Sequence, residues 1–463
     1  MKILLIYPSR LNDSDRVIKY RKAFSPPLSL GIISGLTPER HDVSVINDLV
    51  ERVDFDAPVD LVGITALTSQ ADRAYQICAG FREKGVKTII GGVHPSLMTE
   101  EARQHADAVV VGEVENVWGQ ILSDVENNSL QPIYNNGTFD DLSCAVKPRW
   151  DRMNLGVYRR SPGRKYPRIP IYTTRGCVHN CSYCSVTKFF GRTYRFRPVA
   201  QVCDEIDSTG AESYFFVDDN ISCNPDYSRE LFTALQNRKI SWFSQASTTI
   251  LNTPELIPMM SKAGCRHLFL GIETLDRQTL LQVKKGFNRP EKYKELFRRL
   301  LEVNIQPWCS LIYGLPHDTP YSLEKTVSYL KSCGVGNIVI WILTPLPGTD
   351  LYDQFEKEGK IIDRRWSHYD LNHVVYQPKN FQARELIEYY WKSYKKIYGL
   401  NQIVKHVTGY ANPVKVGLPS AIKTIAGQFY FRKQVNHHEH PFAMGLNRLE
   451  TKEGPGARCP KRE

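Results

Sequence analysis

The amino-acid sequence predicts an α/β protein built from two successive α/β domains and a smaller helical C-terminal region. Short apolar, β-branched runs alternate with helical stretches across residues 1–130, and the alternation begins again near residue 169. Continuously apolar strands separated by helices indicate parallel sheets covered on both faces. A chain of 463 residues is also longer than one hydrophobic core usually organises.

Residues 1–130 form the first predicted domain, of Rossmann-like or flavodoxin-like type. We expect a helix across 70–84 and strands at KILLIY, DVSVIND, VDLVGIT, KTIIGG and ADAVVVG. Ligands of such folds bind beyond the carboxyl ends of the strands. The loops expected there are 63–65, 91–95 and 112–113, and no GxGxxG nucleotide fingerprint occurs.

Three further regions follow the first domain. Residues 131–168 are rich in Asn, Gly and Pro and are expected to form a surface linker. Residues 169–365 contain six apolar strands, each followed by a helix-like stretch, which predicts a partial (β/α)6 barrel of TIM type. Residues 366–463 combine an aromatic helix with a basic tail and are expected to form a small helical domain.

Composition and charge exclude several classes of protein. The chain has 42% hydrophobic residues and lacks an apolar run long enough for a membrane span, and its short N-terminal apolar run does not fit a signal peptide. We therefore expect a cytoplasmic protein. Its net charge of +11 is concentrated in 147–168 and at the C-terminal end, without a nucleic-acid-binding motif. This charge indicates a solvated linker and tail, with a membrane surface or an anionic substrate as alternatives.

Three cysteines, Cys177, Cys181 and Cys184, lie within eight positions in the string RGCVHNCSYC. The spacing is too tight for a disulfide framework, and the second pair that a closed zinc site needs is missing. Thiolates are the usual ligands of iron–sulfur clusters, and three of them leave one iron of a 4Fe-4S cluster without a protein ligand. The motif therefore predicts a cluster that can bind a substrate or cofactor.

This motif, with Tyr183 before its last cysteine, resembles the signature of the radical S-adenosylmethionine (SAM) superfamily. The segments PPLSLG at 26–31, GGVHP at 91–95 and ADAVVVGE at 106–113 resemble the cobalamin-binding domain that precedes the barrel in many members. The resemblance covers residues 1–380. It identifies the chain as a member of the group that contains class B radical SAM methyltransferases and anaerobic cyclases.

The resemblance implies that the open iron binds SAM and that reductive cleavage of SAM gives a 5′-deoxyadenosyl radical. Where many family members have Gly-Gly-Glu after the second strand, this chain has FFVDDN, so Asp218 and Asp219 would contact the amino group of SAM. A helix cap is the structural alternative for these acids. The remaining SAM contacts implied by the resemblance are Tyr183, Ser244, Gln245 and Glu273.

For cobalamin, the resemblance implies contacts from the loops at the strand ends of the first domain. The Asp-x-His-x2-Gly string that supplies a cobalt ligand in other cobalamin proteins is absent, and His94 is not assigned to cobalt. His94 is instead expected to line the pocket of the cofactor tail, or to be a polar loop residue. The expected cobalamin contacts are Thr65, Gly91, Gly92, His94, Gly112 and Glu113.

The resulting functional prediction is a cobalamin-dependent methyltransferase acting on an unactivated carbon of a lipid or other secondary metabolite. Flavodoxin or ferredoxin would supply electrons, and no nucleic acid partner is expected. The alternatives are a cyclase, a rearrangement or another oxidoreductase reaction, with or without cobalamin. The aromatic stretches 388–398 and 429–433 suit either core packing or contact with a membrane surface. No side chain is assigned as catalytic.

Overall fold

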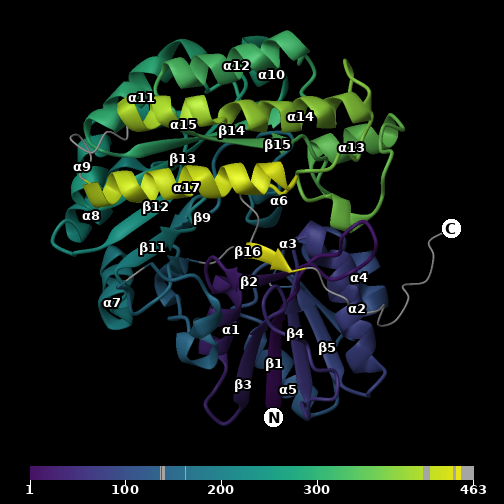
Figure 1. The fold of residues 1–463 in the computed structure, drawn as a ribbon. Coiled ribbons are helices and arrows are strands. Elements are labelled where there is room, and N and C mark those ends of the chain that lie inside the picture. Colours follow the sequence, from purple (N-terminus) through teal and green to yellow (C-terminus); the bar gives the residue numbers. More distant parts are fainter. Residues whose placement is uncertain (136, 138–140, 162, 410–417, 442–444, 450–463) are drawn as a thin grey trace.

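The computed structural model describes residues 1–135, 137, 141–161, 163–409, 418–441 and 445–449 (Figure 1). Two six-stranded sheets dominate these residues, and every pair of neighbouring strands within them is parallel. This arrangement confirms the predicted α/β class. The basic residues 450–463 and Cys459 lie outside the described residues.

The first sheet has the strand order β3-β1-β4-β5-β6-β7. If the six strands of this sheet are numbered by their order in the chain, they lie in the order 2-1-3-4-5-6. This order is flavodoxin-like, which is one of the two predicted types, Rossmann-like and flavodoxin-like. The strands are β1 (Lys2–Tyr7), β3 (Asp42–Asn47), β4 (Leu61–Thr65), β5 (Lys87–Gly91), β6 (Ala108–Val111) and β7 (Ile133–Asn135). The last of these, β7, falls within the range that the sequence suggested as a linker.

Helices cover both faces of the first sheet, because its strands carry apolar side chains on both sides. Leu4, Val62 and Ile90 pack against α2, whereas Leu5 and Ile89 lie in the cluster that contains α1 and α5 side chains. The helices are α1 (Leu28–Leu36), α2 (Ala71–Arg82), α3 (Val93–Leu97), α4 (Thr99–His105) and α5 (Trp118–Glu126).

The second sheet has the order β15-β14-β13-β12-β11-β8, so each strand lies beside the next one in the chain. The sheet does not close between β8 and β15, and it therefore forms the predicted partial barrel. Its strands are β8 (Ile169–Ile171), β11 (Ser213–Phe216), β12 (Ser241–Ala246), β13 (Cys265–Glu273), β14 (Gln306–Tyr313) and β15 (Asn337–Ile342).

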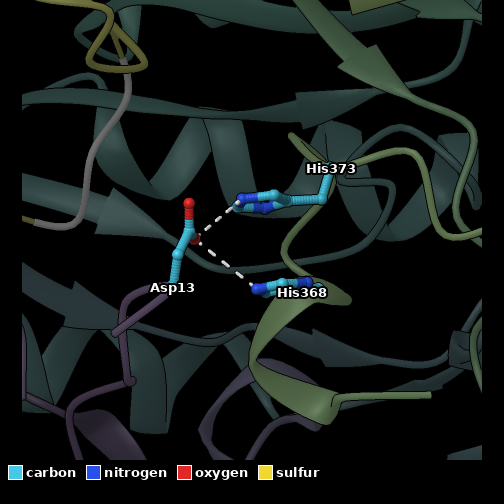
Figure 2. A group of neighbouring side chains, drawn as sticks. All are labelled: Asp13, His368 and His373. Carbon is cyan, nitrogen blue, oxygen red and sulfur yellow. Dashed lines mark ion pairs between the residues drawn. The ribbon is translucent and has the colours of Figure 1, made fainter. Parts of the chain in front are cut away.

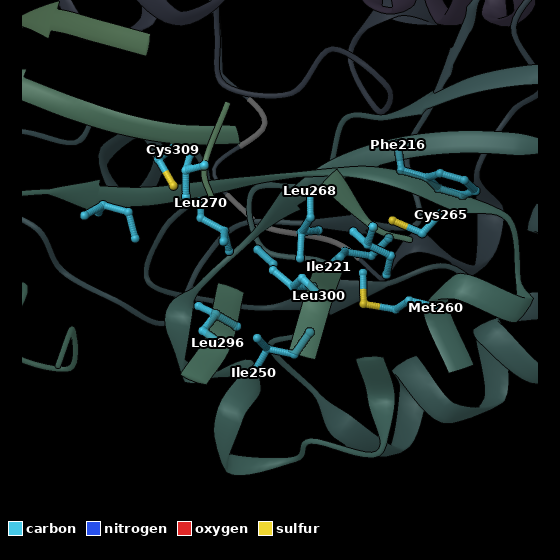
Figure 3. Packing of buried hydrophobic residues seen from close by; sticks show 14 of the residues in the cluster. Phe216, Ile221, Ile250, Met260, Cys265, Leu268, Leu270, Leu296, Leu300 and Cys309 are labelled. Atoms are coloured by element: carbon cyan, nitrogen blue, oxygen red, sulfur yellow. The ribbon is translucent and has the colours of Figure 1, made fainter. Parts of the chain in front are cut away.

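Helices pack on the outside of this barrel. Leu268 and Leu270 of β13 meet Leu296 and Leu300 of α11 there, within a core that continues to Met260 of α9 (Figure 3). The barrel helices are α6 (Val186–Phe189), α7 (Val199–Thr209), α8 (Pro225–Leu235), α9 (Leu256–Lys262), α10 (Arg277–Gln282), α11 (Tyr293–Glu302), α12 (Pro320–Ser332) and α13 (Asp350–Lys357).

The C-terminal helices α14 (Ala383–Ile397), α15 (Leu400–Gly409) and α17 (Leu418–Asn436) lie beside the barrel (Figure 1). Helix α14 covers the free edge of β15: the Tyr394 hydroxyl accepts from the Ile340 N–H at 2.8 Å and lies 2.9 Å from its carbonyl, and Tyr398 donates to the Ile338 carbonyl. Both tyrosines are buried. For the stretch 388–398, these contacts favour core packing over a membrane surface.

Two segments from the C-terminal region return to the first domain. Trp366 and Tyr369 are buried in the same hydrophobic cluster as α2, and β16 (Gly445–Leu449) pairs with β2 (Lys19–Ala23). The first domain is thus completed by residues far from it in the sequence. Among the described residues, we find no helix that combines the length and the apolar character needed to cross a bilayer.

Candidate cofactor site

The cysteine loop is an excursion between two short antiparallel strands, β9 (Thr174–Arg175) and β10 (Arg195–Phe196). Gly176 opens it with φ +89°, and a Cβ there would lie 2.4 Å from the Thr193 carbonyl oxygen, so only glycine fits. Further along, the Ser182 N–H donates to the Val283 carbonyl at 3.1 Å, and the Ser182 carbonyl accepts from the Leu351 N–H at 3.0 Å. The loop is therefore fixed at its entrance and in the middle of the motif.

Cys177, Cys181 and Cys184 are free thiols in this loop. Burial is the main cause that raises the pKa of Cys177 to about 11 and of Cys184 to about 12, and it also raises the pKa of Cys181. Three sheltered thiols without a disulfide partner suit soft metal ligation, because a bound metal replaces the proton of each thiol. The donor set fits an iron–sulfur cluster.

A network of polar side chains surrounds Glu273 at the end of β13. Glu273 has φ +64° where the register with β14 shifts, and its buried carboxylate lies 2.6 Å from Lys285 Nζ. The Tyr183 hydroxyl donates to it at 3.3 Å and the Ser310 hydroxyl at 3.2 Å. The structure thus brings Tyr183 and Glu273 together. The sequence did not single out Lys285, which reads as a surface residue in QVKKGF.

Asp218 and Asp219 follow β11 but face different surroundings. The carboxylate of Asp218 is fully buried and accepts hydrogen bonds from the backbone and hydroxyl groups of Thr173 and Thr174. These bonds leave Asp218 in a structural role. Asp219 lines a cavity between the first domain and the barrel, and burial together with the charge of Asp218 raises its pKa to about 7. Of the two acids, only Asp219 is placed to meet a ligand.

Ser244 and Gln245 alternate across β12. The Ser244 side chain is buried, and its hydroxyl donates to the Phe216 carbonyl at 2.8 Å. The Ser244 hydroxyl is therefore already bonded to the neighbouring strand, and we leave Ser244 out of the proposed SAM contacts. Gln245 is half-buried and points to the opposite face of the sheet, so it remains a proposed contact.

A cavity of about 240 Å³ lies between the first domain and the barrel. Its wall includes apolar side chains of the first sheet, of α1 and of α5, as well as the strand-end loops. Its barrel side includes Tyr172, Thr174, Arg175, Phe189, Phe190, Val217 and Asp219. The cavity therefore joins the carboxyl edge of the first sheet to the base of the cysteine loop.

The expected cobalamin contacts Thr65, Gly91, Gly92, Gly112 and Glu113 all line this cavity. Gly112 has φ +78° with no heavy atom within 4 Å of an added Cβ, so its backbone borders open space. The apolar slot formed by Leu5, Ile89 and Trp118 suits a flat aromatic tail. The residues that line the cavity fit a corrinoid.

The His94 side chain lies outside this cavity. It is fully buried, with Nε2 3.1 Å from the Tyr75 hydroxyl, and its ring packs edge-on against Trp366. The polar-residue alternative therefore fits His94 better than a contact with the cofactor tail. His94 lies away from the cavity because of a tertiary contact. Trp366, from the segment after the barrel, packs over α2 and α3 and covers the His94 ring.

Glu113 links the two sides of the cavity. Its carboxylate accepts from Arg175 at 2.9 Å and from Arg195 at 2.8 Å, and these residues are the ends of β9 and β10. Burial alone would raise the pKa of Glu113, but the guanidinium groups of Arg195 and Arg175 hold it below its ordinary value. Glu113 is thus an ionised bridge to the strands that carry the cysteine loop. The sequence assigned it to the cofactor only.

Two family models match the chain, and each one matches one side of the cavity. The model of the B12 binding domain matches residues 17–122, and the model of the radical SAM superfamily matches residues 171–330. The cysteine loop lies within the second range, and the strand-end loops of the first sheet lie within the first.

Two relatives from Chlorobaculum tepidum cover most of the chain. The chain is 30% identical over 438 residues to bacteriochlorophyllide d C-8(2)-methyltransferase, covering 90% of this chain and 94% of that protein. It is 28% identical over 398 residues to bacteriochlorophyllide d C-12(1)-methyltransferase, covering 84% and 86%.

Among solved structures, the fold resembles that of the cobalamin-dependent SAM radical enzyme OxsB, solved with aqua-cobalamin and SAM bound. The TM-score is 0.62 at 15% sequence identity, and the match covers 94% of this chain and 72% of that one. The likeness shows that both domains share a fold with OxsB.

Proposed function

Because the chain belongs to the family of radical SAM enzymes with an N-terminal B12-binding domain, we propose that it methylates an unactivated carbon of a small molecule. The observation that carries the proposal is the shared cavity, in which the strand-end loops of the first domain face Asp219 and Arg175 beside the cysteine loop. A methyl donor and a substrate radical must meet in one space, and this cavity offers it.

The cofactors supply the difficult chemistry: the cluster and SAM give a 5′-deoxyadenosyl radical, and cobalamin carries the methyl group. The chain's own part is to hold them in register and to exclude water. Cys177, Cys181 and Cys184 would hold the cluster. The loops at 65, 91–92 and 112–113 would hold the corrinoid.

For SAM, we propose two groups of contacts. Asp219 would accept a hydrogen bond from the cationic amino group, because a carboxylate on the cavity wall offers a charge-assisted acceptor. Glu273 would meet the ribose hydroxyls, with Tyr183, Lys285 and Ser310 fixing its carboxylate before SAM arrives. Gln245 would contact the same cofactor from β12.

The substrate we propose is a large, mainly apolar metabolite, and a tetrapyrrole is the first to test. Both Chlorobaculum relatives are named as methyltransferases of bacteriochlorophyllide d, and each match covers more than four fifths of the chain. A lipid is the second substrate class. The proposal also includes a cytoplasmic location, electrons from ferredoxin or flavodoxin, and contact of the exposed part of 429–433 with a membrane surface.

The test is turnover under anaerobic conditions with SAM carrying a carbon-13-labelled methyl group and a chlorophyllide-type substrate. We expect a retained corrin absorption band, release of 5′-deoxyadenosine, and labelled carbon in the product. A product without label, or with a new ring, would favour the cyclase alternative. Labelled product from protein without corrin would contradict the cobalamin-dependent proposal.

A further inference from the structure

Two histidines and an aspartate converge where a loop of the first domain meets the segment that follows the barrel (Figure 2). Nε2 of His368 and Nε2 of His373 each lie 3.5 Å from Oδ1 of Asp13. The two imidazole rings stack with centroids 4.4 Å apart and planes 7° from parallel. The three donor atoms all lie within 4.8 Å of one another.

These separations match the edge of a small coordination polyhedron. Zinc binds imidazole nitrogen at about 2.0–2.1 Å and carboxylate oxygen at about 2.0–2.2 Å, which places neighbouring ligand atoms of a tetrahedral site about 3.4 Å apart. The two nitrogen–oxygen separations of 3.5 Å agree with that value. Because each Nε2 lone pair lies in the plane of its ring, the two stacked rings would have to splay apart for both to point at one ion between the three donors.

A second carboxylate orients each histidine. Nδ1 of His368 lies 2.6 Å from Asp363, and Nδ1 of His373 lies 2.9 Å from Asp370. A carboxylate at Nδ1 accepts the ring proton and leaves the lone pair of Nε2 for a metal, as in carboxylate–histidine–metal triads. Asp370 is itself buried in an ion pair with Arg10. Both rings therefore present Nε2 toward Asp13.

Asp13 is held on a tight turn but remains open to solvent. The side-chain oxygen of Asn12 accepts from the Ser14 N–H at 3.0 Å and the Arg16 N–H at 2.9 Å. The Asp13 side chain is 78% exposed. The turn fixes where the carboxylate stands, and its exposure gives an ion a path of entry and room for a water ligand.

Arg365 is the cation nearest to this group. Its guanidinium donates to the Asp13 carbonyl at 3.4 and 3.3 Å and lies 3.4 Å from Nε2 of His368. The side chain is 41% exposed, so it can turn outward into water when a metal ion takes its place beside the ring. The hydrogen bonds of Arg365 go to the backbone carbonyl of Asp13 and do not depend on the Asp13 carboxylate.

We propose that Asp13, His368 and His373 bind a divalent first-row transition-metal ion, with zinc the best match and water as the fourth ligand. Asp13 lies on the loop that leaves β1, and both histidines lie on the segment after the barrel. The ion would join these two segments across the domain boundary. The site contains no cysteine and is separate from the cluster loop.

The experiment uses the full chain with its iron–sulfur cluster reconstituted, freed of loose metal by chelator and gel filtration. Titration with Zn²⁺ against a chromophoric chelator should reveal one tight equivalent. Asp13→Asn and His373→Gln should each weaken its binding by more than about tenfold, because each removes a direct ligand. Asp363→Asn should weaken it by about 10-fold to 100-fold, because it frees the orientation of His368.

Two controls separate this site from other sources of zinc binding. Asp15→Asn changes an exposed acid on the same turn, 3.5 Å from Arg365, and should leave the affinity unchanged. A variant with alanine at 177, 181 and 184 should keep the zinc equivalent, because that equivalent is not thiol-bound. Circular dichroism checks that each variant is folded. Wild-type protein without a tight equivalent, or unchanged affinity in both Asp13→Asn and His373→Gln, would overturn the proposal.

Discussion

Glu113 and Arg175 form an ion pair of 2.9 Å between the end of β6 and the strand that leads into the cysteine loop. Both side chains are largely shielded from water, with exposed fractions of 6% and 12%. A shielded pair of this kind is costly to break from one side, because the remaining charge is left without a partner. The pair therefore ties the position of the proposed corrinoid loop to that of the proposed cluster loop.

Replacing Glu113 by Gln should separate SAM cleavage from methyl transfer. The neutral amide forms no ion pair with Arg175 or Arg195, so of these ion pairs only that of Arg175 with Glu115 still links the two sides of the cavity. We expect 5′-deoxyadenosine formation to stay within about twofold, and methylated product to fall by at least about tenfold, since small misplacements are costly for transfer. Glu39→Gln, in an exposed pair with Arg149, is the control. Equal loss of both activities in Glu113→Gln would contradict the proposed coupling.

Gly91→Leu should lower corrin occupancy by at least about tenfold, because its side chain would enter the cavity beside Val110. Gly91 is a better position for this test than Gly92. Gly92 has φ +100°, which would strain the backbone of any other residue, and a Cβ there would lie 2.9 Å from the Ala66 backbone. Gly119→Leu is the matched control, since nothing lies within 4 Å of its added Cβ. The measurement is the corrin absorption after gel filtration. Full occupancy in Gly91→Leu would place the corrinoid elsewhere.

The two neighbouring aspartates should respond differently to alanine. Asp219→Ala should raise the Kd for SAM by about tenfold or more while the iron content stays constant, because a charge-assisted acceptor is lost. Asp218→Ala should instead lower the melting temperature, because Thr173 and Thr174 lose their buried acceptor. Equilibrium binding and thermal scans distinguish the two effects. A normal Kd in Asp219→Ala would return Asp219 to a structural role.

The three motif cysteines should be separable from the buried ones. Cys177→Ala, Cys181→Ala and Cys184→Ala should each abolish cluster assembly. Cys203→Ala and Cys333→Ala should keep the iron content, because Cys203 on α7 and Cys333 at the end of α12 belong to the hydrophobic core. Iron and sulfide analysis with the visible spectrum gives the result. A complete cluster in the triple alanine variant would refute the assignment.

Asp318 should make stability depend on pH. Burial raises its pKa to about 7, although the N–H groups of Leu315 and Gly314 act in the opposite direction. The folded protein therefore binds a proton that the unfolded chain has released between about pH 4 and 7, and stability falls as pH rises through that range. The effect is at most about 4 kcal/mol. Asp318→Asn should reduce this slope and leave the part that Asp219 contributes, which melting temperatures at about pH 5 and pH 8 would reveal. An unchanged slope would contradict this origin.

The sequence was sufficient to predict those parts of the fold and of the site that depend on residues close together in the chain. Cysteine spacing predicted the cluster loop, and apolar runs predicted the strands of both sheets except β7. Strand alternation could also have separated the two acids, because Tyr214 and Phe216 are buried and position 218 continues their face.

The remaining features depend on contacts between distant residues. Trp366 covers His94, Lys285 pairs with Glu273, and Arg195 reaches Glu113 across 82 positions. The strand β7 appeared in a stretch rich in turn residues because β6 offered it a free edge. No periodicity or spacing rule reports such pairings, so a sequence can propose the groups of a site without showing which of them face the ligand.

The tyrosine hydroxyls that occupy the edge of β15 also have a consequence for the protein in concentrated solution. A strand with free N–H and C=O groups is a template on which other molecules can add strands, and full barrels avoid the danger by closing. This barrel stays open, and Tyr394 and Tyr398 take up backbone groups that an intruding chain would need. Phenol groups thus protect the β15 edge of this unclosed barrel against the addition of a further strand.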